Sequence, residues 1–581
     1  MATVGIDLGT TNSLVSVWQD DKCTLIPNNL GEYLTPSVVG IDENGEMLVG
    51  RTAKERLISH PESTVASFKR FMGTEKTFML GNRRFTAADL SSMVLRQLKE
   101  DAEKYLGEPV EEAVISVPAY FNDFQRNATK MAGELAGLTV ERLVNEPSAA
   151  ALAYRFGKTK EDQTFLVFDF GGGTLDISIV DAFDSVIEIV AVAGDNHLGG
   201  DDVNRAIAEK FLSVNRIDEG KITNEERASL IRESEKLKRT LTDAPEGEME
   251  VVIGGQIYQM KLDAKGLLEV SAKLLEGIGI PLKRAMNDSG YGWEDIDEII
   301  MIGGSGKMKI VQNYLQFLSG KRPRCEIDPD VAVAVGAGMY AGIKERQQAV
   351  RDVLLTDICP FTLGTEIIHG DPKGPAIMSP IIERNSVLPI SRVERYWTVH
   401  QFQEYCDITI LQGEHRYADQ NLELGRIRVP VPLARREDQR EAVDVRFTYD
   451  INGILDVTVV STKEHFSKMI VNKDIHLTPE QIEERRKELQ KIKIHPREQE
   501  KNRLLLERGD RLYEENTGEI RKYLDKILAD FSVALNAQDL RTIEKAYTRT
   551  SELLDIVENT PKRSVPVKIE AYLYDEWRRQ Q

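Results

Sequence analysis

The sequence predicts an α/β domain with a duplicated strand–turn–strand unit, followed by an antiparallel β-sandwich and a helical C-terminal region. Two stretches predict the duplication: residues 4–17 read VGIDLGTTNSLVSV and residues 165–180 read FLVFDFGGGTLDISIV. Each runs from an apolar strand through an aspartate and a glycine-containing turn into a strand of alternating apolar residues. Short strands and regular turns between residues 358 and 475, including the Asn-Gly hairpin signal at 452–453, predict the sandwich.

The two turns carry groups that suit a phosphate and its metal. In the first unit, the hydroxyl, amide and backbone donors of Thr10, Thr11 and Asn12 can surround an anion, and the carboxylate of Asp7 lies where Mg²⁺ could bind. The second unit repeats this aspartate as Asp169. One unit alone would equally fit an ordinary hairpin, but two units in one chain can face each other across a cleft that holds phosphates.

A third glycine turn, EIIMIGGSGKM at residues 298–308, follows another apolar strand. It resembles a P-loop superficially, but it lacks the leading glycine at Met301 and has Met308 where a Ser or Thr must bind Mg²⁺. The P-loop interpretation therefore fails. A backbone-lined turn against a nucleoside and a plain strand-to-helix turn both remain open.

Polar side chains between these turns are weaker candidates. Four recur at helical spacing on one face, where such residues are usually only solvated: Glu235, Lys238, Arg239 and Thr242. Lys69 in SFKRFMG could equally be a surface lysine. Glu146 in VNEPSAAALAY could equally be a helix-entry acid ahead of Pro147.

Bulk composition limits the function classes. The 581 residues suggest about three or four domains, with 41% hydrophobic and 29% charged residues, as in globular proteins. The net charge of −19 argues against nucleic acid or an anionic membrane as the main ligand. The four cysteines form no C-x-x-C pair, the N-terminus shows no secretory signal, and no apolar run is long enough for a membrane helix. A reducing, cytoplasmic location is expected.

Seven motifs together resemble the DnaK-type seventy-kilodalton heat-shock chaperones. They are GIDLGTTNS, SVPAYFNDFQRNATKMAG, NEPSAAALAY, FDFGGGTLDISIV, GDNHLGGDD, ESEKLKRTL and IDPDVAVAVGAG, and their order and spacing also fit from residue 2 to about residue 475. The resemblance implies an actin-like, ribonuclease-H-like duplicated ATPase domain over residues 1–349. It also implies attack of water on the γ-phosphate of ATP, with Mg²⁺ and K⁺ as cofactors. The short helical region favours a specialised member, such as the HscC-like branch.

The resemblance assigns residues to each part of the nucleotide. Those lining the phosphates are Thr10, Thr11, Asn12, Gly171, Gly172 and Thr174. Those of the adenosine pocket are Glu235, Lys238, Arg239, Thr242, Gly303, Gly304, Ser305 and Asp330.

The same resemblance assigns the catalytic groups. Lys69 would contact the γ-phosphate and orient the attacking water, while Asp7 and Asp169 would hold a hydrated Mg²⁺. Glu146 and Asp176 complete the acidic surround, with Asp169 helping to deprotonate the water. Such a site works by positioning and charge stabilisation.

Two departures from the family pattern affect these expectations. Lys307, in the adenosine pocket, replaces a common arginine, and Lys309 replaces a proline. An ammonium cannot stack on adenine as a guanidinium can, so weaker nucleotide retention is expected. Arg239 would then provide the only guanidinium that stacks on the base. The segment from Gly73 to Phe85 is also abbreviated, so partner contacts there do not transfer.

Residues 350–357 read as an apolar interdomain linker. Asp352, Val353, Leu354 and Leu355 are unusually apolar for a linker, which favours docking as an added strand edge in one state and release in another. A core strand of the next domain is the alternative. By resemblance, Pro118 and Arg126 relay the state of the phosphate site towards the other domain.

Residues 358–475 would form the peptide-binding β-sandwich. By resemblance, Ile368 and Val399 arch over an extended client peptide, and the cleft is lined by Thr365, Ile367, Tyr396, Cys406 and Ile408. Without the family match, these residues would be read as core. Thr365 and Cys406 replace larger apolar residues, so client preference does not transfer.

Residues 476–581 would form a short helical lid. Thr478, Pro479 and Gln481 form its N-terminal capping signal, and an apolar stripe follows: Ile520, Tyr523, Leu524, Ile527, Leu528 and Phe531. A J-domain co-chaperone and a nucleotide exchange factor are implied partners, tail-binding co-chaperones are not expected, and a monomer is expected. The rival functions are a small-molecule kinase and a filament-forming ATPase of the actin-like superfamily.

Overall fold

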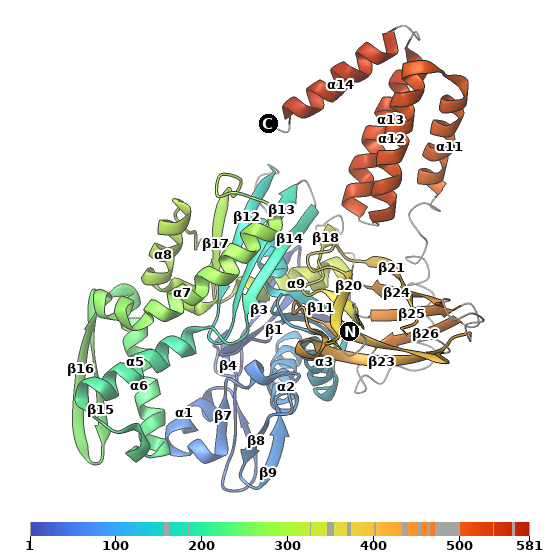
Figure 1. Ribbon diagram of the computed structural model, residues 1–581. Coiled ribbons are helices and arrows are strands. Elements are labelled where there is room, and N and C mark those ends of the chain that lie inside the picture. Colours follow the sequence, from blue (N-terminus) through green and yellow to red (C-terminus); the bar gives the residue numbers. More distant parts are fainter. Residues whose placement is uncertain are drawn as a thin grey trace. The chain divides into compact units, whose positions relative to one another are not determined.

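The computed structural model describes residues 2–155, 162–183, 186–325, 327–345, 354–368, 374–399, 403–432, 440–450, 455–461, 465–470, 500–537, 540–560 and 564–579 (Figure 1). Of these, the residues up to Phe361 form one unit and those from Thr362 onward form a second. Some sequence predictions lie outside the described residues: Asp352 and Val353, the turn at Asn452–Gly453, and the capping residues Thr478, Pro479 and Gln481.

Two sheets in the first unit have corresponding strand orders. The first has the order β11-β10-β1-β2-β3 and the second has the order β17-β12-β13-β14-β18. In each, three consecutive antiparallel strands (β1–β3 or β12–β14) are extended by a parallel neighbour, β10 or β17. The strands are β1 Ala2–Asp7, β2 Asn12–Gln19, β3 Lys22–Ile26, β10 Val110–Val117, β11 Thr139–Asn145, β12 Gln163–Phe170, β13 Leu175–Phe183, β14 Val186–Asp195, β17 Glu298–Ile302 and β18 Leu354–Thr356.

The predicted strand–turn–strand units are therefore the hairpins β1–β2 and β12–β13. The turn between β1 and β2 ends before Asn12, which already belongs to β2. Asp169 lies opposite Asp176 in the register of the second hairpin.

Helices of the first sheet pack in two groups. One group is α2 Ala87–Leu106 and α3 Asp123–Leu135, which share an apolar core with the sheet. The other is α4 Glu146–Arg155 and the small-residue helix α9 Ala332–Lys344. A Cβ at Gly336 of α9 would lie 1.8 Å from the carbonyl oxygen of Ala149, and one at Gly338 would lie 2.3 Å from Oγ of Ser16. Only glycine permits this close approach to α4 and β2.

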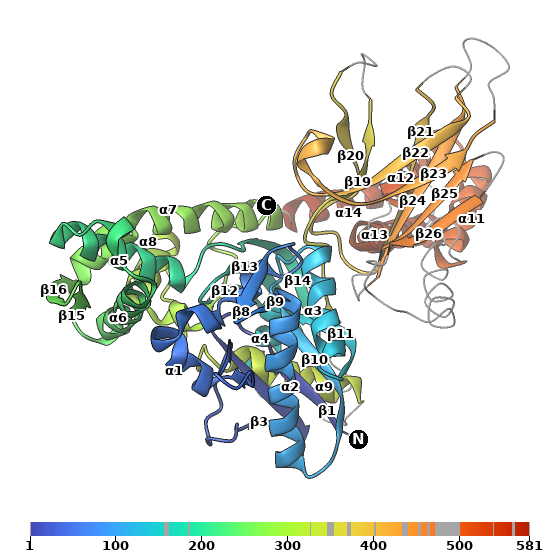
Figure 2. The same ribbon diagram turned by 90° about the horizontal axis from the view of Figure 1, so that it is seen from below.

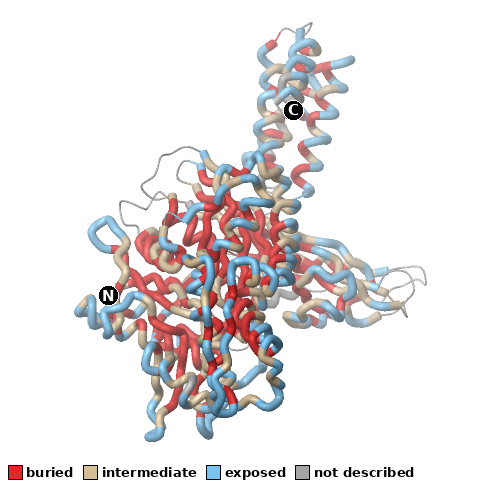
Figure 3. Tube along the Cα trace, turned by 90° about the vertical axis from the view of Figure 1, so that its left-hand side faces the viewer, coloured by how far each residue is buried: buried red, intermediate tan, exposed pale blue. Residues whose placement is uncertain are grey.

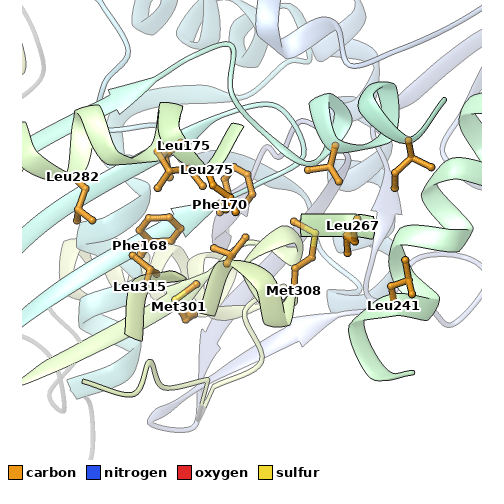
Figure 4. Packing of buried hydrophobic residues seen from close by; sticks show 14 of the residues in the cluster. Phe168, Phe170, Leu175, Leu241, Leu267, Leu275, Leu282, Met301, Met308 and Leu315 are labelled. Atoms are coloured by element: carbon orange, nitrogen blue, oxygen red, sulfur yellow. The ribbon is translucent and has the colours of Figure 1, made fainter. Parts of the chain in front are cut away.

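The second sheet is covered by a separate apolar core (Figure 4). Phe168, Phe170 and Leu175 of the β12–β13 hairpin pack with Leu275 of α7 and Leu315 of α8. The surrounding elements are α5 Gly200–Asn215, α6 Asn224–Asp243, β15 Glu246–Ile253, β16 Gln256–Asp263, α7 Ala264–Ser289 and α8 Lys309–Ser319. Each half of the duplication thus has its own core, so the halves can move as rigid lobes.

Smaller elements complete the first unit: β4 Thr35–Pro36, β5 Val38–Ile41, β6 Met47–Val49, α1 Arg51–Ser59, η1 Pro61–Ser63, β7 Thr64–Ala66, η2 Phe68–Phe71, β8 Thr77–Leu80, β9 Arg83–Thr86, η3 Glu219–Lys221 and η4 Gly304–Lys307. Buried residues follow the strands, and exposed residues gather in the connecting turns (Figure 3). Among the described helices, none combines the length and the apolar character that crossing a bilayer requires.

The second unit contains two four-stranded antiparallel sheets, with the orders β20-β19-β22-β23 and β21-β24-β25-β26 (Figure 2). Their strands are β19 Leu363–Ile367, β20 Ile377–Ile382, β21 Ile390–Trp397, β22 Tyr405–Gln412, β23 Leu422–Pro430, β24 Ala442–Tyr449, β25 Leu455–Ser461 and β26 His465–Ile470, with the turn η5 Ala418–Gln420.

Four helices follow among the residues that the structure describes: α11 Glu500–Glu515, α12 Gly518–Ala537, α13 Leu540–Asn559 and α14 Val565–Arg579. The predicted apolar stripe lies on α12. Ile520, Leu524, Ile527 and Phe531 are buried in the shared core of these helices.

Candidate active site

A cavity of about 380 Å³ in the first unit is lined by residues from both glycine turns. It gathers residues that the sequence analysis assigned to the phosphates, the metal and the adenosine: Asp7, Thr10, Thr11, Asn12, Lys69, Glu146, Asp169, Gly171, Gly172, Thr174, Glu235, Lys238, Arg239, Thr242, Gly303, Gly304, Ser305, Lys307 and Asp330. Asp176 is not among the lining residues, since its side chain is buried on β13 opposite Asp169.

The two glycine turns touch each other. A Cβ at Gly172 would lie 2.0 Å from Oγ1 of Thr11, and a Cβ at Gly173 would lie 2.7 Å from the methyl group of Thr10. Glycine is therefore required at both positions for the turns to meet. Backbone amides of both lobes thus converge on one space, which is the arrangement that binds phosphate oxygens.

Lys69 and Glu146 form a buried ion pair at the cavity. Nζ of Lys69 donates to Oε1 of Glu146 over 2.8 Å, and both side chains are almost fully excluded from solvent. The same ammonium lies 5.6 Å from the ring centre of Phe121. A lysine held this way presents a fixed positive charge to the cavity, because it cannot swing out into water.

Three aspartates near this pair are crowded and dehydrated. Burial, followed by repulsion from Glu146, raises the pKa of Asp7 and that of Asp176 to about 7, and raises the pKa of Asp169 well above its usual value. Oδ2 of Asp176 is buried without a hydrogen-bond partner among the described residues. A divalent cation would relieve this repulsion, so the donor set fits Mg²⁺.

The number of carboxylates also suits a mostly hydrated ion. Among the described residues, no group of three or more His, Cys, Asp or Glu side chains is arranged to ligate a metal. Mg²⁺ usually keeps several waters and takes one or two carboxylates together with substrate phosphates. Asp7, which accepts a 2.9 Å hydrogen bond from Ser116, and Asp169 suffice for that mode of binding.

The opposite part of the cavity is built from α6 and the turn after β17. Lys307 donates to Asp328 over 2.7 Å and to Asp330 over 2.6 Å. Burial would lower the pKa of Lys307, but these two bonds outweigh it and raise the pKa. Arg239 is exposed and pairs with Glu235 over 2.6 Å. Both cations are thus already held by carboxylates of the pocket.

A chain of hydrogen bonds leads from α3 to the segment after β18. Arg126 donates to Oδ1 of Asn145 over 2.6 Å, and Nδ2 of Asn145 donates to Asp357 over 2.6 Å. Pro118 is buried at the end of β10. Leu354 and Leu355 of β18 pair in parallel with Val186 and Ile187 of β14, at the edge of the second sheet.

The predicted peptide-contacting residues differ in exposure. Thr365 and Ile408 are buried, and the hydroxyl of Thr365 donates to the backbone oxygen of Thr409 over 2.8 Å. The others retain exposed surface: Ile367, Ile368, Tyr396, Val399 and Cys406. Ile368 is the most accessible, at 38% exposed.

Sequence reasoning gave no role to several residues that the structure brings to these places. Asp201 and Asn204 line the cavity, Asp328 binds Lys307, and Asp357 ends the hydrogen-bonded chain from Arg126. The acidic pair in the motif GDNHLGGDD was the available signal for Asp201. Asp328 stands in the motif IDPDVAVAVGAG, which was the available signal for it, whereas Asp357 stands in no pattern that distinguishes it from a surface acid.

A cleft in which two lobes offer backbone donors to the same phosphates, with acids for the metal beside them, belongs to the class of two-lobed nucleotide-binding ATPases. Comparison with family models narrows this class. Residues 3–568 match the model described as Hsp70 protein. Because the match covers nearly the whole chain, the chain belongs to the Hsp70 family, and the resemblance found in its motifs is confirmed.

The chain is therefore an ATP-dependent molecular chaperone of the heat-shock family that acts in protein folding. It hydrolyses ATP to ADP and phosphate with Mg²⁺, through the actin-like ATPase domain that the family shares. Client polypeptides and co-chaperones are its general partners. Nothing in the comparison favours the small-molecule kinase.

Proposed function

We propose that the cavity between the two glycine turns is the hydrolytic site, with the roles that the family resemblance implies. The observation that carries this proposal is the contact between the turns, at Gly172 with Thr11, beside the buried pair Lys69–Glu146. Backbone amides of both turns would bind the phosphates, together with the side chains of Thr10, Thr11, Asn12 and Thr174.

The buried charged groups divide the tasks of this scheme among them. Lys69 would hold the γ-phosphate and the attacking water in line, and Glu146 would keep the ammonium of Lys69 in place. Asp169 would accept the proton of the water. Asp176 would belong to the acidic residues around the metal and the water. Its Oδ1 accepts a hydrogen bond from the backbone N–H of Tyr120 over 2.9 Å.

Asp7 and Asp169 would hold the hydrated Mg²⁺, which neutralises phosphate charge when bound. K⁺ is proposed as a second cation of the same acidic region. Replacing K⁺ by Na⁺ at constant ionic strength should lower the hydrolysis rate; an unchanged rate would remove K⁺ from the scheme.

The adenosine would lie against Glu235, Lys238, Arg239, Thr242, Gly303, Gly304, Ser305, Lys307 and Asp330. This pocket is proposed to retain nucleotide more weakly than one with the arginine common in the family. The ammonium of Lys307 is bound to two aspartates and cannot stack on adenine as a guanidinium can. Lys307→Arg should slow ADP release severalfold in a fluorescent-nucleotide chase. Equal release rates in both proteins would contradict the proposal.

The ATPase domain is proposed to span residues 1–349 and the linker residues 350–357. Docking of the linker would report the nucleotide state, since Leu354 and Leu355 extend the second sheet and Asp357 is bonded through Asn145 to Arg126. Pro118 and Arg126 would relay the change at the phosphates, with Asp352 and Val353 as further linker residues. ATP must prefer the docked state by about 5.5 kcal/mol to move it from 1:99 to 99:1.

Residues 358–475 are proposed as a peptide-binding β-sandwich and residues 476–581 as its short lid. Two antiparallel four-stranded sheets and a four-helix core among the described residues support this division. Ile368 and Val399 would arch over the client, and the cleft would be lined by Thr365, Ile367, Tyr396, Cys406 and Ile408.

We also propose that the protein is a cytoplasmic, monomeric, HscC-like member of the family. It would work with a J-domain co-chaperone and a nucleotide exchange factor. The filament-forming alternative predicts self-association of the lobes. Sedimentation with ATP separates the two, because a monomer would keep its sedimentation coefficient as the protein concentration rises.

The decisive experiment is single-turnover ATP hydrolysis with and without an extended apolar peptide, together with peptide release with and without ATP. We expect peptide to accelerate hydrolysis and ATP to accelerate peptide release. No effect in either direction would contradict the proposed coupling.

A further inference from the structure

The turn that carries Lys69 is bound across the cleft on both sides of the lysine. Ser67 immediately precedes the 3-10 turn η2, and its Oγ donates to Oδ2 of Asp201 over 2.8 Å. Arg70, the residue after Lys69, donates from Nη2 to Oδ2 of Asp202 over 2.8 Å. The two donors belong to the first lobe, and the two acceptors stand in the first turn of α5 in the second lobe.

The acceptors are fixed to the second phosphate turn. The backbone N–H of Asp201 donates to the carbonyl of Gly172 over 2.8 Å, and that of Gly200 donates to the carbonyl of Gly171 over 3.0 Å. A Cβ at Gly199 would lie within 2.6 Å of the backbone of Gly172, so the start of α5 and this turn are packed as one piece. A displacement of Asp201 therefore also displaces the phosphate turn.

Ser67 has an unusual backbone for a residue with a side chain. Its φ is 54°, in the left-handed region that non-glycine residues seldom occupy. A conformation of this kind persists only where the surrounding structure enforces it. The hydrogen bond to Asp201 anchors the Ser67 side chain in this conformation, directly ahead of Phe68, a core residue, and Lys69.

We propose that Ser67 and Arg70 are positioning residues that couple closure of the two lobes to the placement of Lys69. When the lobes are closed, the bonds to Asp201 and Asp202 hold η2 so that Lys69 faces the γ-phosphate. When the lobes part, both bonds break, and the turn is free to withdraw the lysine. Hydrolysis is thereby restricted to the closed cleft, and ADP leaves only after the same bonds have opened. This inference rests on the proposed role of Lys69.

The test is single-turnover hydrolysis of bound ATP and release of fluorescent ADP in full-length variants. Ser67→Ala removes the donor, and Asp201→Ala removes the acceptor. Each should slow hydrolysis about tenfold and speed ADP release severalfold, in keeping with the loss of a hydrogen bond to a charged group. The double variant should be no more impaired than the worse single one, because both substitutions break the same bond.

Two further substitutions separate the hydrogen bond from the backbone. Ser67→Gly accepts the left-handed conformation but has no donor, and it should behave like Ser67→Ala. Ser67→Asn also tolerates this conformation and retains an N–H donor, so it should restore part of the activity. If Ser67→Ala does not fold, Ser67→Gly carries the same test. Unfolding midpoints of all variants exclude a general loss of structure.

Ser63→Ala is the matched control. Ser63 lies in the same segment at similar exposure, but its hydroxyl donates to the nearby carbonyl of His60 and, among the described residues, not across the cleft. It should hydrolyse and release nucleotide like the parent. Parental rates in Ser67→Ala and Ser67→Gly, or multiplicative effects in the double variant, would overturn the proposal.

Lys69→Ala is measured in parallel. If it still hydrolyses ATP, the proposed site itself fails, and the cross-cleft coupling fails with it. If it is inactive while the Ser67 variants keep parental rates, only the coupling proposal fails.

Discussion

At the scale of single residues, Lys69 shows how the fold can bury a side chain whose sequence context predicts exposure. Its sequence context is that of an ordinary surface lysine, yet it is 3% exposed and paired with an almost equally buried glutamate. A buried ion pair seldom adds much stability over an apolar pair, but removing one partner leaves an uncompensated charge. Stability alone therefore does not explain the pair, which agrees with the role proposed for Lys69.

Lys69→Ala should abolish turnover while nucleotide binding is largely kept, because the remaining turn and adenosine contacts are untouched. It should also lower the free energy of unfolding by about 3–5 kcal/mol, since Glu146 is left buried without its partner. Urea unfolding and single-turnover hydrolysis measure the two effects separately.

The double variant Lys69→Met/Glu146→Gln is the control for this prediction. It removes both charges, so much of the lost stability should return while hydrolysis stays absent. Recovery of hydrolysis in the double variant would show that the pair is structural. Full stability in Lys69→Ala would show that Glu146 finds another partner.

The sequence alone predicts a phosphate site at Thr10, Thr11 and Asp169 from a repeated motif of glycine, threonine and aspartate, and all three residues line one cavity. It could not assign Asp328 or Asp357. Asp328 stands in a quoted motif that gives it no role, and Asp357 stands alone; their contacts arise from the residues that the fold brings to them, Lys307 and Asn145. Contacts between distant segments leave no local pattern.

At the scale of elements, β18 is the segment whose role depends most on its neighbours. Its three residues are too short for a stable strand by themselves, and they become one by pairing with β14. The carboxylate of Asp357 follows directly. It faces Asn145, Ser148, Arg126 and Arg142, and burial is the largest influence on it.

Docking of β18 should weaken as pH rises. Burial raises the pKa of Asp357 above its ordinary value of 3.8 in the docked state, whereas the released linker returns it to water. The docked state therefore binds this proton more tightly, so docking is strongest below the ordinary pKa and weakens as pH passes through the raised pKa. Amide hydrogen exchange at Leu354–Thr356, expressed as protection factors across about pH 4 to 7, measures the effect.

Asp357→Asn is the matched control for this pH dependence. The carboxamide oxygen can still accept from Asn145 but cannot ionise, so the protection factors should no longer depend on pH in this range. Protection in the parent protein that rises with pH would contradict the assigned sign.

At the scale of the whole molecule, two lobes with separate cores both line the cavity of the first unit, and β18 extends the sheet of one of them. Opening and closing of the cleft can proceed without repacking either core. In the proposed cycle, coupling to the second unit depends on the linker, because β18 is the last strand paired with the second sheet before the chain enters that unit.

Leu355→Asp should uncouple the two units. Leu355 pairs with Ile187, which is buried, and a carboxylate at this edge would oppose docking. Peptide should no longer alter single-turnover hydrolysis, while the basal rate should remain within about threefold of the parent.

Glu345→Asp, a mild change on the exposed end of α9, is the control and should keep the response to peptide. A peptide response in Leu355→Asp equal to that of the parent would show that the signal takes another route.

The sequence by itself determined the duplicated hairpins, their aspartates and the apolar stripe of α12, because strand alternation, turn chemistry and helical spacing are local properties of the chain. Only the tertiary structure decided that Thr11 meets Gly172, that Ser67 reaches Asp201, and that Asp328 holds Lys307. These contacts join segments tens to more than one hundred residues apart. Their partners are selected by how the two lobes pack, and no stretch of sequence encodes that packing locally.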